Sequence, residues 1–144
     1  MTNEELVRNA IEIIWNKGEV SRVRDFYTDD FKAHHSPLGP DWGKGTDGVR
    51  DLVTRTRNTF SDYHETIEDL ILSGDKVVIR TRAVGTNTGP LPFSPATGKS
   101  FKVDVFEIYR INNGKIEEQW ALMDQLSLFL QLGLLKLPSG TQQG

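Results

Sequence analysis

Residues 101–124 read FKVDVFEIYRINNGKIEEQWALMD. Two runs rich in β-branched and aromatic residues flank Asn112-Asn113-Gly114, and such residues favour strands. Asn and Gly tolerate the positive φ that tight hairpin turns require. The stretch therefore predicts a β-hairpin. Glu107 is a carboxylate within the mostly apolar first strand, so the residue that it faces across the hairpin determines how its function is interpreted.

Two registers fit this hairpin. A two-residue loop at Asn113-Gly114 makes Glu107 face Trp120, whereas a three-residue loop with a bulge at Gly114 makes it face Gln119. A slip of one residue moves every side chain to the other face of the sheet. We favour the three-residue loop because Gly114 then takes the left-handed bulge position. This register places on one face Val103, Val105, Glu107, Tyr109, Gln119, Ala121 and Met123.

Length and composition indicate one globular domain. The chain has 144 residues, 37% hydrophobic and 26% charged, and we expect one domain at 1–137 with a disordered tail at 138–144. The net charge of -3 gives no electrostatic case for binding nucleic acid or a membrane surface. The absence of cysteine excludes disulfides and thiol chemistry. No signal peptide or membrane span is evident, so we expect a cytoplasmic protein.

The remaining patterns predict helices grouped before antiparallel strands, which is typical of the α+β class. The first half of the chain predicts a helix from the Thr2/Glu5 capping box to Gly18, a short helix capped by Ser21, a strand at 31–36, and a helix capped by Thr46 and closed by Phe60. The second half predicts strands at 63–72 and 77–86, the hairpin, and a helix at 125–135 that Asp124 caps. A curved antiparallel meander closed on one side by helices forms a cone with a pocket at its mouth. The sheet face toward the helices lines that pocket.

Two segments rich in glycine and proline lie outside these elements. Residues 37–45 form a loop in which Trp42 is a candidate ligand contact. Residues 87–99 form an excursion between strands that is long for a small domain, and such loops are usually functional or mobile.

The whole pattern resembles the nuclear-transport-factor-2-like (NTF2-like) superfamily and, within it, the SnoaL-like polyketide cyclases. The resemblance covers nearly the entire chain and is carried by residues 26–30, 35–37, 45–49 and 107–120. It implies a cone-shaped α+β fold with a pocket for a small hydrophobic molecule and no cofactor. It says less about activity, because this fold hosts many unrelated functions.

The sequence departs from the cyclases at their catalytic carboxylate. The resemblance implies an E-H-W-D tetrad whose aspartate is the acid/base, and here the tetrad is Glu118-Gln119-Trp120-Ala121. The steroid isomerases of the superfamily are similar at Glu107, which matches their neutral carboxylic acid. They differ at Ser36, where their base aspartate would stand.

Glu107, His34 and His35 are the candidate catalytic residues. Glu107 is either a buried carboxyl with a raised pKa or an acid paired across the sheet with Arg80 or Arg82. The two histidines point to opposite faces of a strand, so one of them lines the pocket. The family match favours His35 and strand alternation favours His34, and the sequence leaves both open. The candidate substrate-binding residues are Trp42, Val105, Tyr109, Gln119, Ala121 and Met123.

These features predict a cyclase- or isomerase-type enzyme that transfers a proton on a small hydrophobic carbonyl compound, polyketide-like or terpenoid-like. The alternative is a non-catalytic binding module of the same fold, because Ala121 stands where the aspartate would be. No histidine/carboxylate triad and no nucleotide-binding glycine motif is evident, so we expect no metal and no other cofactor. Apolar residues on the outer sheet face, Phe106, Ile108, Trp120 and Leu122, predict a homodimer.

Overall fold

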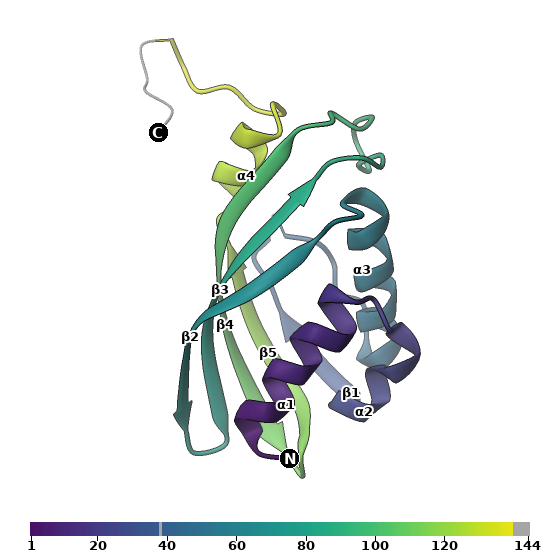
Figure 1. Cartoon of the computed structure of the whole chain (residues 1–144), viewed down its shortest axis with the longest axis vertical. Helices are drawn as coiled ribbons and strands as arrows, with labels where there is room; N and C mark the ends of the chain where they lie inside the picture. Colours follow the sequence, from purple (N-terminus) through teal and green to yellow (C-terminus); the bar gives the residue numbers. More distant parts are fainter. Residues whose placement is uncertain (38, 140–144) are drawn as a thin grey trace.

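The computed structural model describes residues 1–37 and 39–139 and confirms the α+β class (Figure 1). The helical elements are α1 (Asn3–Ala10), the π-helix η1 (Ile11–Asn16), the 3₁₀ turn η2 (Val20–Arg22), α2 (Val23–Phe26), α3 (Gly45–Thr59) and α4 (Gln125–Gln131). The strands are β1 (Tyr27–His34), β2 (His64–Ser73), β3 (Lys76–Thr86), β4 (Ser100–Asn112) and β5 (Lys115–Met123). Of the tail predicted to be disordered, 140–144 lie outside the described residues.

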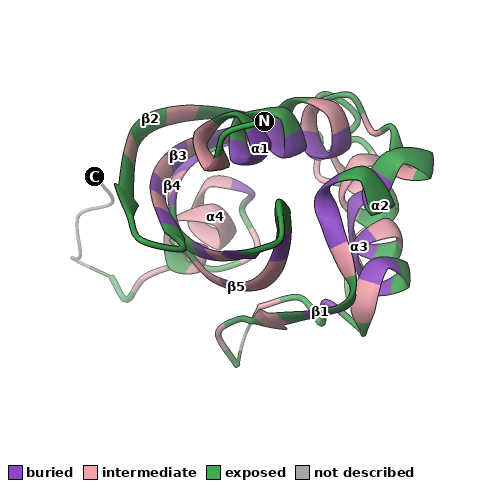
Figure 2. Cartoon of the chain, turned by 90° about the horizontal axis from the view of Figure 1, so that it is seen from below, coloured by how far each residue is buried: buried purple, intermediate pink, exposed green. Residues whose placement is uncertain are grey.

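The strands form one curved sheet in the order β1-β5-β4-β3-β2. Strands β2 to β5 are an antiparallel meander, as predicted, but β1 joins the edge of β5 in the parallel direction. The short strand had no predicted partner, and the structure places it at this edge. Strands β1 and β2 are the two edges, so the sheet is an arc and does not close into a barrel (Figure 2).

The central hairpin corrects the predicted register. Asn112 pairs with Lys115, and Asn113 and Gly114 have φ values of 50° and 74°, so the loop has two residues and not three. A bulge then shifts the register between Arg110 and Ile111. Glu107 consequently faces Ala121 rather than Gln119. The extra residue of the bulge shifts the pairing by one more position, so the same side chains share a face as in the favoured register. The predicted set of inward-facing residues is therefore correct, although the predicted cross-strand pairs are not.

Several predicted boundaries also change. The Thr2/Glu5 capping box is confirmed, and Asp124 caps α4 by accepting a hydrogen bond from the Ser127 backbone N–H. In contrast, neither predicted hydroxyl cap is formed: α2 follows Arg22, and α3 begins at Gly45. The predicted strand at 31–36 begins at residue 27 and ends at residue 34, because Tyr27 already pairs with Ile116 of β5 and, after an irregularity, pairing resumes from Lys32 to His34.

The core lies between the concave face of the sheet and the helices. Helices α1 and α3 lie across the open side of the arc with their buried sides turned inward (Figure 2). Side chains of β4 alternate between buried and exposed along its length, as expected for a strand with one solvated face. On the outer face Phe106 is 55% exposed and Leu122 is 61% exposed. Within the described part of the chain, no helix is both long enough and apolar enough to span a bilayer.

Candidate functional site

A cavity of about 750 Å³ opens between the concave sheet face, the end of α3, α4 and the loop residues 39–42 and 90–93. Aromatic and aliphatic side chains form much of its wall, among them Trp15, Trp42, Leu52, Phe60, Phe101, Val105, Met123, Leu128, Phe129 and Leu132. Two buried carboxyl groups, Glu65 and Glu107, belong to the same wall. The ionisable side chains at its more exposed parts are His35, Asp41 and Arg55.

Glu107 projects from β4 into this cavity and is 5% exposed. The amide Nε2 of Gln119 donates a hydrogen bond of 2.8 Å to Glu107 Oε1. Glu107 Oε2 has no hydrogen-bond partner among the described residues. Burial raises the pKa of Glu107 well above its ordinary value, and the negative charge of Glu65 raises it further. Glu107 is therefore a carboxyl that favours its neutral form, with the side chains of Tyr109 and Gln119 acting against that rise in pKa.

The alternative assignment of Glu107, an ion pair with Arg80 or Arg82, is wrong. Arg80 binds Asp69 with a closest approach of 2.7 Å, and Arg82 binds Asp104 at 3.2 Å. Both arginines point to the outer face of β3, whereas Ile79 and Thr81 of the same strand point to the buried inner face. The arginines therefore cannot reach the inward-facing carboxyl.

Glu65 is a second buried carboxyl that the sequence analysis did not select. It is 7% exposed, and the hydroxyl of Tyr63 donates a short hydrogen bond to its Oε1. Its Oε2 has no hydrogen-bond partner among the residues described. Burial raises the pKa of Glu65, while the bond from Tyr63 opposes that shift. The available signal was the alternation of Tyr63, Glu65 and Ile67, which places a carboxylate between apolar neighbours on one face, as for Glu107.

The backbone of Glu65 is held by the π-helix η1. The side-chain amide of Asn16 donates to the Glu65 carbonyl at 3.0 Å, and Asn16 Oδ1 accepts from the Glu65 N–H at 2.8 Å. Because β2 is an edge strand, Asn16 takes the place of a neighbouring strand at this one residue. Trp15, from the same π-helix, lines the cavity and donates to the hydroxyl of Tyr27 at 3.2 Å.

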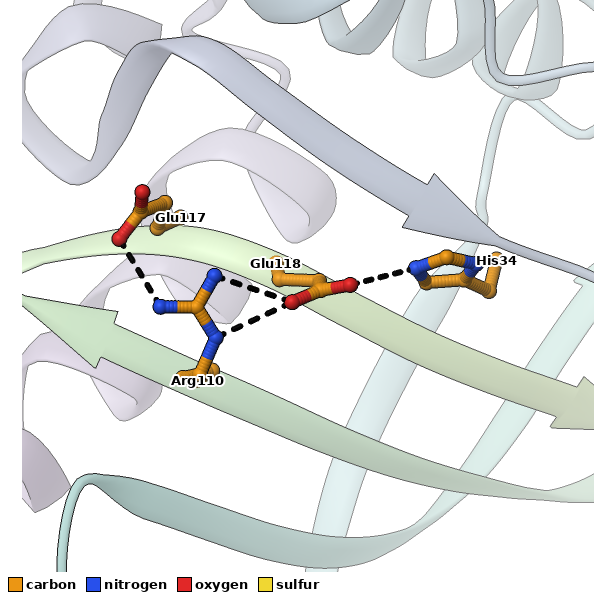
Figure 3. Close-up of polar contacts among 4 residues, drawn as sticks. All are labelled: His34, Arg110, Glu117 and Glu118. Atoms are coloured by element: carbon orange, nitrogen blue, oxygen red, sulfur yellow. Dashed lines mark hydrogen bonds and ion pairs between the residues drawn. The ribbon is translucent and has the colours of Figure 1, made fainter.

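The two histidines lie in different places. His34 is on the outer face, where its Nε2 is 2.7 Å from Glu118 Oε2 and its ring stacks on Trp120 with a centroid distance of 5.1 Å. Figure 3 shows that Glu118 joins His34 to Arg110, whose guanidinium donates to it at 3.0 Å. The bond from His34 and then that from Arg110 lower the pKa of Glu118. The described contacts of His34 are thus with this surface cluster.

His35 lies at the cavity wall. Its Nδ1 is 2.9 Å from the Ser36 carbonyl oxygen, and the Ser36 hydroxyl donates to Gln125 Oε1 at 2.8 Å. Strand alternation does not decide between the histidines because β1 ends at His34. The chain leaves the strand there, and His35 and Ser36 both line the cavity.

The structure brings most of the predicted substrate-binding residues together. Trp42, Val105, Ala121 and Met123 line the cavity, whereas Tyr109 and Gln119 are buried outside its lining. Gln119 reaches the site through Glu107. Trp42 is 8% exposed, and its ring lies 5.5 Å from that of Trp15, so it is a fixed part of the wall although it belongs to a loop.

The segment 87–99 contributes the outer wall through residues 90–93. Its start is attached to the end of α3, where the Gly89 N–H donates to the Thr59 carbonyl at 3.0 Å. A Cβ atom at Gly89 would lie 1.9 Å from the Asn58 carbonyl oxygen, so this close approach requires glycine. Phe93 of the same segment meets the ring of Phe129 on α4 edge to face, with the centroids 6.2 Å apart.

Comparison with known proteins agrees with this architecture. The family model for the SnoaL-like polyketide cyclases matches residues 5–132. The chain is 29% identical over 138 residues to the aklanonic acid methyl ester cyclase DnrD of Streptomyces peucetius, covering 92% of this chain and 91% of DnrD. The structure of TsrD from Streptomyces laurentii superposes with a TM-score of 0.80 at 30% identity, covering 92% of this chain and 95% of TsrD. A protein of Bacillus cereus assigned as a polyketide cyclase superposes with a TM-score of 0.72 at 31% identity, over 85% of this chain and 75% of that one. The chain therefore belongs to the SnoaL-like polyketide cyclase family.

Proposed function

We propose that this protein is a cyclase- or isomerase-type enzyme that moves a proton at a carbon next to a carbonyl group. In this proposal Glu107 is the neutral acid that donates to the carbonyl oxygen. A hydrogen bond or proton given to that oxygen stabilises the enol or enolate that forms when the neighbouring carbon loses its proton. The unpartnered Oε2 of Glu107 is the atom available for this contact.

One observation carries the proposal. Ala121, at the position where the family resemblance implies an aspartate, is the direct cross-strand partner of Glu107. Directly opposed side chains in an antiparallel pair have Cβ atoms about 4.5–5.5 Å apart. A carboxyl group is thus present beside the family's acid/base position, on the neighbouring strand. This supports retained acid/base chemistry despite the alanine.

The wall of the cavity favours a small hydrophobic carbonyl compound, polyketide-like or terpenoid-like. Trp15, Trp42, Phe60 and Phe101 offer aromatic faces, and Met123 adds an adaptable side chain. The relative DnrD is named for an ester, which is also a carbonyl compound. His35, at the cavity wall near the mouth, supplies a polar contact for such a ligand.

A non-catalytic binding module is the second candidate, and Ala121 favours it directly. Losing the aspartate while keeping the cavity is what a binding protein derived from a cyclase would show. The two candidates make different predictions for turnover, because only an enzyme converts the compounds that it binds.

The test is a binding screen of polycyclic and terpenoid ketones and esters, with sugars and phosphorylated compounds as the comparison set. Binders are then incubated with the protein and analysed by mass spectrometry and NMR for conversion. We expect the hydrophobic carbonyl compounds to bind best and at least one to be converted. Preferential binding of sugars or phosphorylated compounds would contradict the substrate class. Binding without any conversion would support the binding module.

A further inference from the structure

Glu65 and Glu107 belong to one cavity wall, and each is more than nine-tenths buried, with 7% and 5% exposure. Each has one oxygen bound by a neutral donor, from Tyr63 and Gln119 respectively, and one without a partner among the described residues. Two buried carboxyls placed in this way can divide acid and base roles between them. We propose that Glu65 is the proton acceptor of this site and works as a carboxylate opposite the neutral carboxyl of Glu107.

This inference rests on the proposed function and assigns its second catalytic group. In the proton-transfer step, the C–H bond next to the substrate carbonyl breaks and its proton passes to Glu65 Oε2. The electron pair of that bond forms the carbon–carbon double bond of the enol, while the carbonyl oxygen takes the proton of Glu107. The reverse transfers return both carboxyls to their starting states. In D₂O the proton held by Glu65 exchanges with solvent before the reverse transfer, so deuterium enters the substrate.

In this proposal Glu65 takes the charge, and the hydroxyl that donates to it supports that role. The Tyr63 hydroxyl donates directly to Glu65, and hydrogen bonds to a carboxylate favour its ionised form. This bond opposes the rise that burial imposes on the pKa of Glu65. Burial and then the charge of Glu65 raise the pKa of Glu107, so an ionised Glu65 favours the neutral form of Glu107.

Glu65 is also the better-positioned base when compared with His35. His35 is exposed, and its Nδ1 contacts a backbone carbonyl. Glu65 is buried, and its backbone is fixed on both sides by Asn16. Fixed orientation and exclusion of water both favour proton transfer from carbon. Asn16 is accordingly a positioning residue, since it contacts Glu65 and not the cavity.

The experiment follows exchange of the acidic C–H protons of 2-tetralone for deuterium in D₂O by proton NMR. This fused bicyclic ketone is a probe of carbon-acid chemistry, and its size is compatible with a cavity of about 750 Å³. The variants are Glu65→Gln, Tyr63→Phe and Glu107→Gln. The matched control is Glu68→Gln, an exposed residue of the same strand. Circular dichroism and thermal unfolding verify that each variant is folded.

We expect the parent and Glu68→Gln to accelerate exchange above the buffer rate. Glu65→Gln should lose about 100-fold or more, the usual effect of removing a proton-transfer group, although its amide oxygen can still accept from Tyr63. Glu107→Gln should retain part of the activity, because its amide still donates. In Tyr63→Phe, the loss of the donor raises the pKa of Glu65, so the acid limb of the pH–rate profile should move to higher pH.

Two other results would overturn the assignment in distinguishable ways. Exchange that persists in Glu65→Gln but disappears in His35→Gln makes the histidine the base and leaves the proposed function intact. Absence of exchange in the parent protein argues against proton transfer on hydrophobic ketones, and it removes the role of Glu65 together with the proposed function. An unchanged pH profile in Tyr63→Phe shows that Tyr63 does not tune the base, and it contradicts the division of roles between the carboxyls.

Discussion

Glu107 of β4 and Ala121 of β5 are direct partners in the central antiparallel ladder. The bulge between Arg110 and Ile111 creates this pairing, because without it the two-residue turn would set Glu107 opposite Trp120. The uninterrupted pairing of β4 with β3 fixes the side of Glu107, and the bulge puts the methyl group of Ala121 beside the carboxyl. Replacing either partner tests how much charge this pair of positions accepts.

Ala121→Asp restores the carboxylate that the family resemblance implies, directly opposite Glu107. Two carboxyls at this spacing disfavour a second ionisation, so the variant should be less stable than the parent by about 1–3 kcal/mol at pH 8, the usual cost of a poorly compensated buried polar group. The deficit should shrink at pH 5, where the acids can be neutral. Urea unfolding at the two pH values measures this, and Ala121→Asn is the uncharged control. An equal loss in both variants would make the effect one of size and not of charge.

Glu107→Gln should change how stability depends on pH. The folded-state pKa of Glu107 lies above that of an unfolded glutamate, so its neutral form favours folding at low pH. That contribution is complete below the unfolded pKa and is lost as pH rises through the folded pKa. The variant removes this loss, so relative to the parent its midpoint of thermal unfolding should rise between pH 5 and pH 8. Parallel pH curves for the two proteins would mean that Glu107 titrates normally.

The adjacent histidines offer an internal comparison of inner and outer positions. His34→Ala removes a contact with Glu118 in which the histidine side chain is 48% exposed, so it should cost only about 0–1 kcal/mol and leave ligand affinity unchanged. His35→Ala alters the cavity wall and should weaken binding of the carbonyl compounds found in the screen. Isothermal titration with one such compound measures both. Weaker binding in His34→Ala alone would contradict the placement of the two rings.

Much of the fold followed from local pattern. Alternation in β3 and β4, the capping box of α1 and the cap at Asp124 are properties of a few neighbouring residues, and all are present. In β2 the alternation holds only as far as Ile67, where the register shifts. The parallel addition of β1 to β5 was not predictable in this way. It joins residues about ninety positions apart, and nothing in a strand's own sequence states which edge it will join.

The residues of the site that lie close together in the sequence were predicted from local pattern, and the others were not. One hairpin carries Val105, Glu107, Ala121 and Met123, and the alternation of side chains along its two strands was sufficient to place them on one face. Glu65 reaches the same cavity from β2, two strands away from β4, through the curvature of the sheet. Such a meeting depends on tertiary structure, although the apolar neighbours of Glu65 on its own face are visible in the sequence.

The outer face of the sheet predicts a homodimer. Phe106 and Leu122 are cross-strand partners, and with Ile108 at 38% exposure they are apolar side chains that α4 leaves exposed. Exposed apolar surface of this kind is typical of an interface between copies, so we expect a dimer by light scattering at micromolar concentration.

Leu122→Glu should weaken association at least tenfold, because burying a leucine is worth about 1.5–3 kcal/mol and the new charge must lose water. Leu126→Glu is the matched control, since Leu126 is 53% exposed on α4 and lies off the sheet face. A parent protein that is monomeric at high micromolar concentration would contradict the dimer, and a monomer produced only by Leu126→Glu would move the interface to α4.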